Sequence, residues 1–219
     1  MAISYERQLR IFNPDEHKDS RVTVIGLGNI GSNTAVLLAR LGIKNLSLYD
    51  FDTVDNHNLT SQYYDIDSLG KPKANVLADK IEKINPDIKV SGCNWIFEAP
   101  HFDTEAITII AIDTMEERKK ICNDLIKMKT KLVHPLIDGR VGGTQLEVYT
   151  ANSLEEWQST FVSKPSKDPC GGRFICYVST MVASIITGQV KKILNRERYD
   201  KSMMVNADSL QVVKDFSWK

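Results

Sequence analysis

Three glycines near the start of the chain have the spacing of a phosphate-binding turn. Gly26, Gly28 and Gly31 form the pattern G-x-G-x-x-G between a β-branched run and a segment with helical periodicity. The first glycine permits a tight turn, the second lets a phosphate approach the backbone, and the third lets the following helix pack closely on the strand. A tight turn without a ligand is the alternative, but the strand–turn–helix context favours a nucleotide site.

Asp50 provides a second chemical group, at the end of the next predicted strand. It lies nineteen residues after Gly31, and a carboxylate at this place can accept hydrogen bonds from ribose hydroxyls. The turn and the carboxylate together predict a bound nucleotide. They do not distinguish NAD from ATP.

These groups must be positioned by strands and helices that alternate along the chain. Apolar runs and helical periodicity predict strands at 21–26, 45–50, 88–93, 106–112, 131–137 and 145–149, and helices at 31–41, 73–84, 115–128 and 177–194. Such alternation is typical of an α/β fold, here a Rossmann-like, mostly parallel sheet with helices on both faces, C-terminal strands and a final long helix. Parallel strands end at one sheet edge, so we expect 26–31, 50–62 and Asp113 to lie together.

The length of the chain agrees with one domain. A chain of 219 residues with 42% hydrophobic content can bury one sizeable core. We expect a single nucleotide-binding domain over 1–219, divided into an N-terminal helical segment 1–20, a Rossmann-like core 21–150, a crossover loop 151–170, and a C-terminal helix and tail 171–219.

The charge and the cysteines exclude several classes of function. Lys plus Arg and Asp plus Glu both number 28, so we expect no nucleic-acid or membrane partner. The N-terminus has no apolar region typical of a signal peptide. The four cysteines form no C-x-x-C pair, so we predict no zinc site and a cytoplasmic protein with free thiols.

Beyond Asp50 the sequence departs from dehydrogenases and resembles another family. The segments that carry the resemblance are Tyr5-Glu6-Arg7-Gln8, Asp50-Phe51-Asp52-Thr53-Val54, Asn58-Leu59-Thr60-Ser61-Gln62, Gly70-Lys71-Pro72-Lys73-Ala74, Asp113 with Arg118 and Asn123, and Ile137-Asp138-Gly139-Arg140. In this order they resemble the ThiF/MoeB/HesA family of adenylyltransferases, which are similar to ubiquitin-activating enzymes. The resemblance covers about Tyr5 to Leu194.

The resemblance implies an ATP-dependent enzyme. Members of the family use ATP and Mg²⁺ to convert the C-terminal glycine of a small ubiquitin-like (β-grasp) or sulfur-carrier protein into an acyl adenylate. Carried over by position, Asp50 would hold the ribose, and Asn58, Gln62 and Lys73 would line the phosphates. Asp52 and the three glycines complete the expected nucleotide site, and Asp113 would carry the magnesium. Arg7 would reach the site of a neighbouring subunit, which implies a homodimer.

Several of these residues also have simpler explanations. Lys73 could be a solvated lysine at the start of a helix. Asp113 could be a helix N-cap. Arg7 could form a surface ion pair worth about 0–1 kcal/mol. For His57 and His134 we favour structural or surface positions, because no metal-ligand spacing accompanies them.

Cys170 is the candidate nucleophile for a thioester or a sulfur transfer. It lies before the final predicted helix, as the family's cysteine does, and Arg173 and a helix N-terminus could stabilise its thiolate. An ordinary loop thiol is the alternative. We expect Cys176 to pack inside that helix, and Cys93 and Cys122 to lie in the core.

One departure from the family pattern leaves the activity open. Ser61 stands where the family has an arginine, and a hydroxyl cannot neutralise phosphate charge. Lys71 could supply the missing charge; otherwise the activity is weaker or the chain is a non-catalytic partner subunit. An NAD-dependent oxidoreductase is a further alternative, although it leaves 70–74 and Arg7 unexplained. The sequence does not choose between sulfur transfer, protein conjugation and modification of a tRNA base.

Overall fold

The computed structural model of the chain describes residues 3–161 and 175–215. The candidate nucleophile Cys170 lies outside these residues. Within them, no helix is both long enough and apolar enough to cross a membrane.

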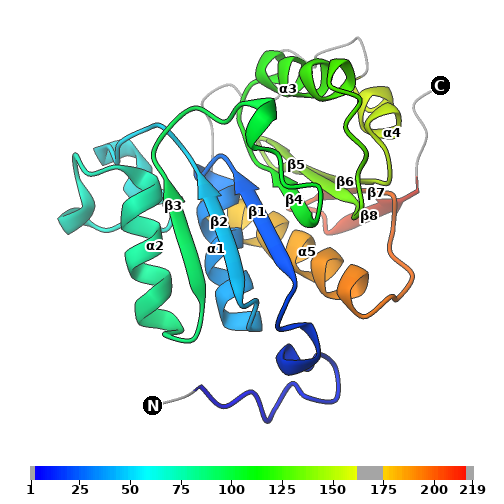
Figure 1. Cartoon of the computed structure of the whole chain (residues 1–219). Coiled ribbons are helices and arrows are strands. Elements are labelled where there is room, and N and C mark those ends of the chain that lie inside the picture. The colour runs from blue at the N-terminus through cyan, green and yellow to red at the C-terminus, as the bar shows by residue number, and fades with distance from the viewer. Residues whose placement is uncertain (1–2, 162–174, 216–219) are drawn as a thin grey trace.

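The described residues build one mixed β-sheet (Figure 1). Its eight strands follow the order β3-β2-β1-β4-β5-β6-β7-β8. The neighbours from β3 to β5 pair in parallel, and those from β5 to β8 pair antiparallel. The strand bounds are β1 Arg21–Ile25, β2 Asn45–Tyr49, β3 Lys89–Cys93, β4 Ala106–Ile110, β5 Leu136–Gly142, β6 Gln145–Ala151, β7 Ser202–Asn206 and β8 Gln211–Lys214.

Helices cover both faces of the sheet, as predicted. They are α1 Asn29–Leu41, α2 Lys73–Ile84, α3 Met115–Lys127, α4 Leu154–Ser159 and α5 Cys176–Leu194, with short 3-10 helices η1 Pro14–His17, η2 Asn56–Thr60, η3 Ile66–Ser68 and η4 Ala99–His101. One core lies between the sheet and α1, α2 and α5. A second, smaller core lies between the other face and α3 and α4.

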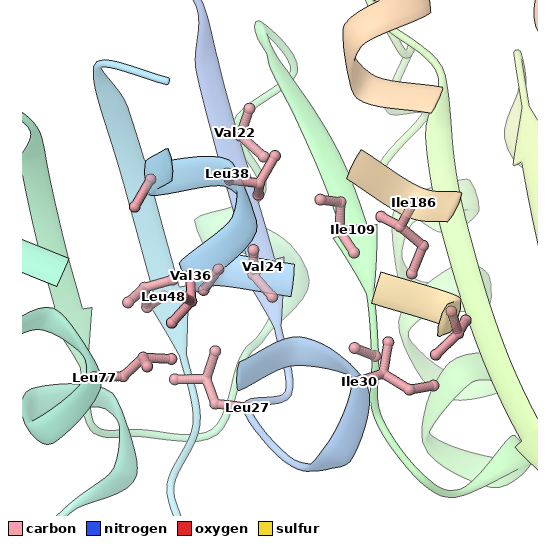
Figure 2. Close-up of a cluster of buried hydrophobic side chains, with 14 of the residues drawn as sticks. Val22, Val24, Leu27, Ile30, Val36, Leu38, Leu48, Leu77, Ile109 and Ile186 are labelled. Atoms are coloured by element: carbon pink, nitrogen blue, oxygen red, sulfur yellow. The ribbon is translucent and has the colours of Figure 1, made fainter. Parts of the chain in front are cut away.

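The larger core follows from the alternation of side chains along each strand. Val22 and Val24 of β1 face α1, and Figure 2 shows them beside Leu38 and Ile109. Ile186 of α5 reaches the same cluster. The parallel strands are therefore rich in β-branched residues because both of their faces are covered.

The predicted α/β fold is confirmed, but three details of the prediction are wrong. The N-terminal segment 1–20, which we expected to be helical, forms turns over 6–11, and among its described residues the only helical turn is η1. The strand expected at 131–137 begins only at Leu136, because Pro135 has no N–H to pair with a neighbouring strand. The final helix is followed by the strands β7 and β8 where we expected a tail.

The turn between β1 and α1 brings helix and strand into very close contact. Gly26 has a φ of +87°, a conformation that glycine adopts at little cost. A Cβ at Gly31 would lie 1.8 Å from the carbonyl oxygen of Gly26. The third glycine of the pattern is therefore required by packing, whatever ligand binds the turn.

This contact gives the first testable prediction. Gly31→Ala should lower the free energy of unfolding by about 2 kcal/mol or more, because backbone must move to admit the methyl group. The matched control is Gly188→Ala in α5, where nothing lies within 4 Å of the new Cβ. It should stabilise the protein by about 1 kcal/mol through helix propensity. Urea unfolding measures both; equal effects of the two substitutions would contradict the packing argument.

Candidate functional site

A cavity of about 1250 Å³ opens at the carboxyl ends of the parallel strands. Its walls come from the segments that follow β1, β2, β3 and β4, from η2 and from one side of α3. The strand order reverses between β1 and β4, because β2 lies on one side of β1 and β4 on the other. Ligands of open α/β sheets bind at such a switch point.

Asp50 ties the glycine turn to the end of β2. Its Oδ2 accepts a hydrogen bond of 2.6 Å from the N–H of Leu27, and its Oδ1 accepts one of 2.8 Å from the N–H of Asp52. Burial raises the pKa of Asp50, although these hydrogen bonds and the charge of Lys73 act in the opposite direction. The carboxylate is thus held at the cavity wall beside Gly28, where it can still accept bonds from ribose hydroxyls.

Lys73 is buried at the cavity wall, so the alternative of a solvated lysine is wrong. It is the first residue of α2, and only 5% of it is exposed. Its Nζ lies 3.1 Å from Oδ2 of Asp52, which is half exposed, and its N–H donates to the carbonyl of the same residue. Asp52 thus holds the ammonium group of Lys73 at the cavity wall.

The segment η2 and the residues after it pack against the start of α1. Asn58 is buried, and its Oδ1 accepts a hydrogen bond from the N–H of Asp55. Ser61 donates to Oδ1 of Asn29 at 2.6 Å. Oε1 of Gln62 is buried and has no hydrogen-bond partner among the described residues. The side chains of Asn58, Ser61 and Gln62 all line the cavity.

Lys71 is not in the position that would compensate for Ser61. It is exposed and does not line the cavity. The basic side chains among the described lining residues are Lys73, Arg118, Lys120 and Lys127. Of these, Lys73 is linked to the glycine turn by hydrogen bonds: its Nζ donates to Asp52, whose N–H donates to Asp50, which also accepts from the N–H of Leu27.

Asp113 projects from the loop between β4 and α3 and is exposed at the cavity. Its side chain makes no hydrogen bond with any described residue. The N-cap of α3 is Thr114, whose Oγ1 accepts from the N–H of Glu117 at 3.3 Å, so the alternative role of Asp113 as a cap is wrong. An unengaged carboxylate fits Mg²⁺, which is commonly held by one or two carboxylates together with substrate phosphates.

The described residues contain no cluster of three or more His, Cys, Asp or Glu side chains suited to a metal ion. A magnesium ion at Asp113 would therefore take most of its ligands from the nucleotide and from water. Such an ion would be bound together with ATP.

A buried ionic network that we did not predict lies beside the cavity. Asp138 of β5 is fully buried and accepts hydrogen bonds from Arg118 at 3.0 Å, from Arg140 at 3.0 and 2.6 Å, and from Trp157 at 2.9 Å. Burial alone would raise the pKa of Asp138, but the charges of Arg140 and Arg118 hold it below its usual range. In the sequence, Asp138 and Arg140 lie in an apolar run, which could have indicated buried charges but not their partners in α3 and α4.

The segment 137–140 extends beyond residue 137, where we expected this strand to end. It lies inside β5, which continues to Gly142. The face of α3 toward the cavity was also missed, although Glu117, Ile121, Asp124 and Met128 recur at helical spacing. The aromatic wall of Tyr49, Trp95 and Phe97 gave no comparable signal, because its members come from separate segments.

The N-terminal segment before η1, which includes Arg7, lies at the end of the sheet opposite the carboxyl ends of β1 and β2 (Figure 1). The turn that carries Arg7 is fixed by a hydrogen bond from Asn85 to Tyr5 and by one from Gln8 to Leu41. Leu41 ends α1 and Asn85 follows α2, and both helices end at the amino-terminal edge of the sheet. Arg7 is exposed there, so within one chain it does not reach the nucleotide site.

The described cysteines differ in exposure. Cys93 and Cys122 are buried, as predicted, and burial raises the pKa of Cys122 to about 11. Cys176 is exposed at the first position of α5, so the prediction that it packs inside the helix is wrong. The first residue of α5 with a buried side chain is Val178, two positions after Cys176.

The two histidines named above lie in different settings. His57 is exposed at the cavity rim, with Nδ1 3.4 Å from Oδ2 of Asp55. His134 is half-buried in the segment before β5 and does not line the cavity.

Several solved structures have the same fold as this chain. Escherichia coli MccB superposes with a TM-score of 0.76 at 19% sequence identity, over 92% of this chain and 63% of that protein. MccB with bound ATP superposes with a TM-score of 0.73. At this level of identity the similarity concerns the fold.

Sequence comparison adds relatives of named activity. The molybdopterin-synthase adenylyltransferase of Haemophilus influenzae is 32% identical over 164 residues, which are 68% of this chain and 64% of that protein. Its counterpart in Escherichia coli K12 is 38% identical over 115 residues, 50% of this chain and 45% of that protein. Ubiquitin-like modifier-activating enzyme 5 of Drosophila pseudoobscura pseudoobscura is 31% identical over 52% of this chain and 29% of that protein.

The matches thus span between about a third and two thirds of each relative's length. The sequence profile of the ThiF family extends much further along this chain, over residues 5–215. It includes the glycine turn, the cavity wall and the C-terminal strands. The chain belongs to the ThiF family.

Proposed function

We propose that this protein uses ATP and Mg²⁺ to adenylate the C-terminal glycine of a small ubiquitin-like or sulfur-carrier protein of the β-grasp fold. The observation that carries the proposal is that one cavity is bordered by the glycine turn, Asp50, Lys73 and the unengaged carboxylate of Asp113. The adenylating activities of relatives support the same reaction class.

Each group has one task in this reaction. The backbone of the glycine turn and the N-terminus of α1 attract the phosphates. Asp50 accepts hydrogen bonds from the ribose, and Lys73 neutralises part of the phosphate charge. Asn58, Gln62 and Asp52 complete the wall around the nucleotide. Asp113 holds Mg²⁺, which supplies further charge neutralisation to the triphosphate when bound.

The chemical step is a displacement at the α-phosphorus of ATP. A carboxylate oxygen of the glycine tail forms the new bond to phosphorus, and the bond to the bridging oxygen of the leaving pyrophosphate breaks. The protein's contribution is to hold the two reactants in line and to neutralise the charge of the leaving group.

We infer that the active unit is a homodimer of one-domain subunits in the cytoplasm. Arg7 supports the dimer, because it is exposed, its segment is bonded to the ends of α1 and α2 away from the cavity, and it is therefore available to another subunit. Cys170 remains our predicted nucleophile for a later thioester or sulfur transfer, and it lies outside the described residues.

A non-catalytic partner subunit is a second candidate, and Ser61 favours it. The Ser61 hydroxyl is engaged by Asn29 and offers the phosphates no positive charge. If this candidate is correct, ATP can still bind but no adenylate forms on this chain.

The choice of nucleotide gives the second prediction. ATP with Mg²⁺ should raise the melting temperature, because a ligand that binds only the native state stabilises it; at one hundred times its Kd the gain is about 2.7 kcal/mol. NAD at the same concentration should leave the melting temperature unchanged. Stabilisation by NAD and not by ATP would identify an oxidoreductase and overturn the proposal.

Catalysis is tested separately by ATP–pyrophosphate exchange. A panel of β-grasp proteins ending in Gly-Gly serves as the acceptor, and the same proteins with the tail amidated are the control. Exchange should require the free carboxylate. Binding of ATP without exchange on any acceptor would favour the non-catalytic partner subunit.

The dimer gives the third prediction. Arg7→Ala and Asp113→Ala should each be almost inactive in exchange, because removal of one preorganised donor costs about 3 kcal/mol in the transition state. After complete subunit exchange, half of the dimers are hybrids, and each hybrid has one site with both residues intact. About a quarter of wild-type activity should therefore return.

The control for this experiment is the Arg7→Ala, Asp113→Ala double variant taken through the same exchange procedure. It should remain inactive, because none of its sites contains either residue. Mass spectrometry of differently tagged subunits verifies that exchange has occurred. No recovery in verified hybrids would show that Arg7 does not act across a subunit interface.

A further inference from the structure

One buried carboxylate, Asp138, holds two arginines that serve different parts of the fold. We propose that Arg118 is a positioning residue for Asp113, and that Asp138 is the anchor on which Arg118 depends. The inference rests on the proposed function, in which Asp113 holds Mg²⁺ at the nucleotide.

Asp113 has to be positioned by the backbone, because its side chain makes no hydrogen bond with any described residue. It directly precedes Thr114, the N-cap of α3. The Thr114 hydroxyl donates to the exposed carboxylate of Glu117 at 3.0 Å, but the two bonds to backbone N–H groups here are long. The Thr114 hydroxyl accepts from the N–H of Glu117 at 3.3 Å, and the N–H of Arg118 donates to the carbonyl of Thr114 at 3.4 Å. Hydrogen bonds of this length are at or beyond the weak end of the usual range.

The side chain of Arg118 attaches this helix start to β5 through buried bonds. Its Nε donates to Oδ1 of Asp138, and its Nη2 donates to the carbonyl of Gly139, both at 3.0 Å. Only 1% of Arg118 is exposed, so solvent does not compete for these bonds. A planar guanidinium bound at two points fixes both the position and the rotation of the first turns of α3 relative to β5.

Arg140 provides an internal comparison, because it binds the same carboxylate but extends in another direction. Its Nη1 and Nη2 donate to the carbonyl and the hydroxyl of Thr160 after α4, and its guanidinium lies 4.4 Å from the ring centre of Tyr149. Arg118 borders the cavity, whereas Arg140 does not. Loss of either arginine disturbs the buried network, but only loss of Arg118 releases the segment that carries Asp113.

The test compares Arg118→Lys with Arg140→Lys. Both variants keep the positive charge and both lose the guanidinium's paired bonds to the Asp138 region. Calorimetry measures the Kd for ATP in EDTA and in Mg²⁺, and the ratio of the Kd in EDTA to the Kd in Mg²⁺ reports the contribution of the metal. Arg118→Lys should reduce this ratio about tenfold, as loss of a group that orients a metal ligand typically does. Arg140→Lys should leave it within about twofold of wild type.

Thermal unfolding of both variants shows whether their losses of stability are comparable. The assignment of Arg118 would be overturned if both variants reduced the ratio of Kd values to a similar extent, or if neither variant reduced it. Where Arg118→Lys does not fold, Arg118→Gln replaces it, because a neutral amide leaves no unpaired ammonium in the core.

Hydrogen exchange of the free protein tests the same inference without any nucleotide. Arg118→Lys should accelerate exchange in peptides covering 113–121, and Arg140→Lys should accelerate it in peptides covering 154–161. If wild type does not bind ATP, the proposed function fails and this measurement still decides the inference. Exchange at 113–121 that is no faster in Arg118→Lys than in Arg140→Lys would overturn it.

Discussion

The close approach of α1 to the end of β1 is the constraint on which the rest of the site depends. The carbonyl of Gly26 occupies the space that a side chain at Gly31 would need, and Ala111 after β4 packs against the same turn. The turn is tied to the end of β2 by the bond from Leu27 to Asp50. It is tied to the segment after η2 by the bond from Tyr64 to the carbonyl of Leu27. Three strand ends and the N-terminus of α1 therefore meet at one point.

The electrostatics of the cavity explain why the proposed binding of a triphosphate would require further cations. Asp50, Asp52 and Asp113 border the cavity near the strand ends, and the charge of Lys73 is paired with that of Asp52. A highly charged anion beside these carboxylates is favoured only with additional cations, such as Mg²⁺ and an arginine from another subunit. Ser61 increases that requirement, because its hydroxyl is already bonded to Asn29.

The sequence was sufficient to predict the parts of the fold that depend on local pattern. The glycine spacing, the apolar runs of β1 and β4 and the periodicity of α2 each determine one element from neighbouring residues. The antiparallel strands β7 and β8 were missed for the opposite reason. β8 is exposed along its whole length, so it lacks the alternation that marks a half-buried strand, and it is recognisable only through its pairing with β7.

The same distinction applies to the site: residues placed by their own strand could be predicted, and residues that meet only through tertiary packing could not. The positions of Asp50 and Asp113 at strand ends could be predicted, because topology alone brings such residues to one edge. The network around Asp138 could not, because its members come from β5, α3 and α4 and meet only after the sheet and both helices have packed.

A side chain that must remain free for a ligand cannot also be fixed by hydrogen bonds of its own. Asp113 meets this requirement, since its carboxylate is unengaged and exposed. Neighbouring residues must then orient this carboxylate by holding the backbone of Asp113 in place. The buried bonds of Arg118 to β5 can do this because they lie away from solvent and do not compete with the ligand. The free carboxylate at the surface and the saturated carboxylate in the core are therefore two parts of one arrangement.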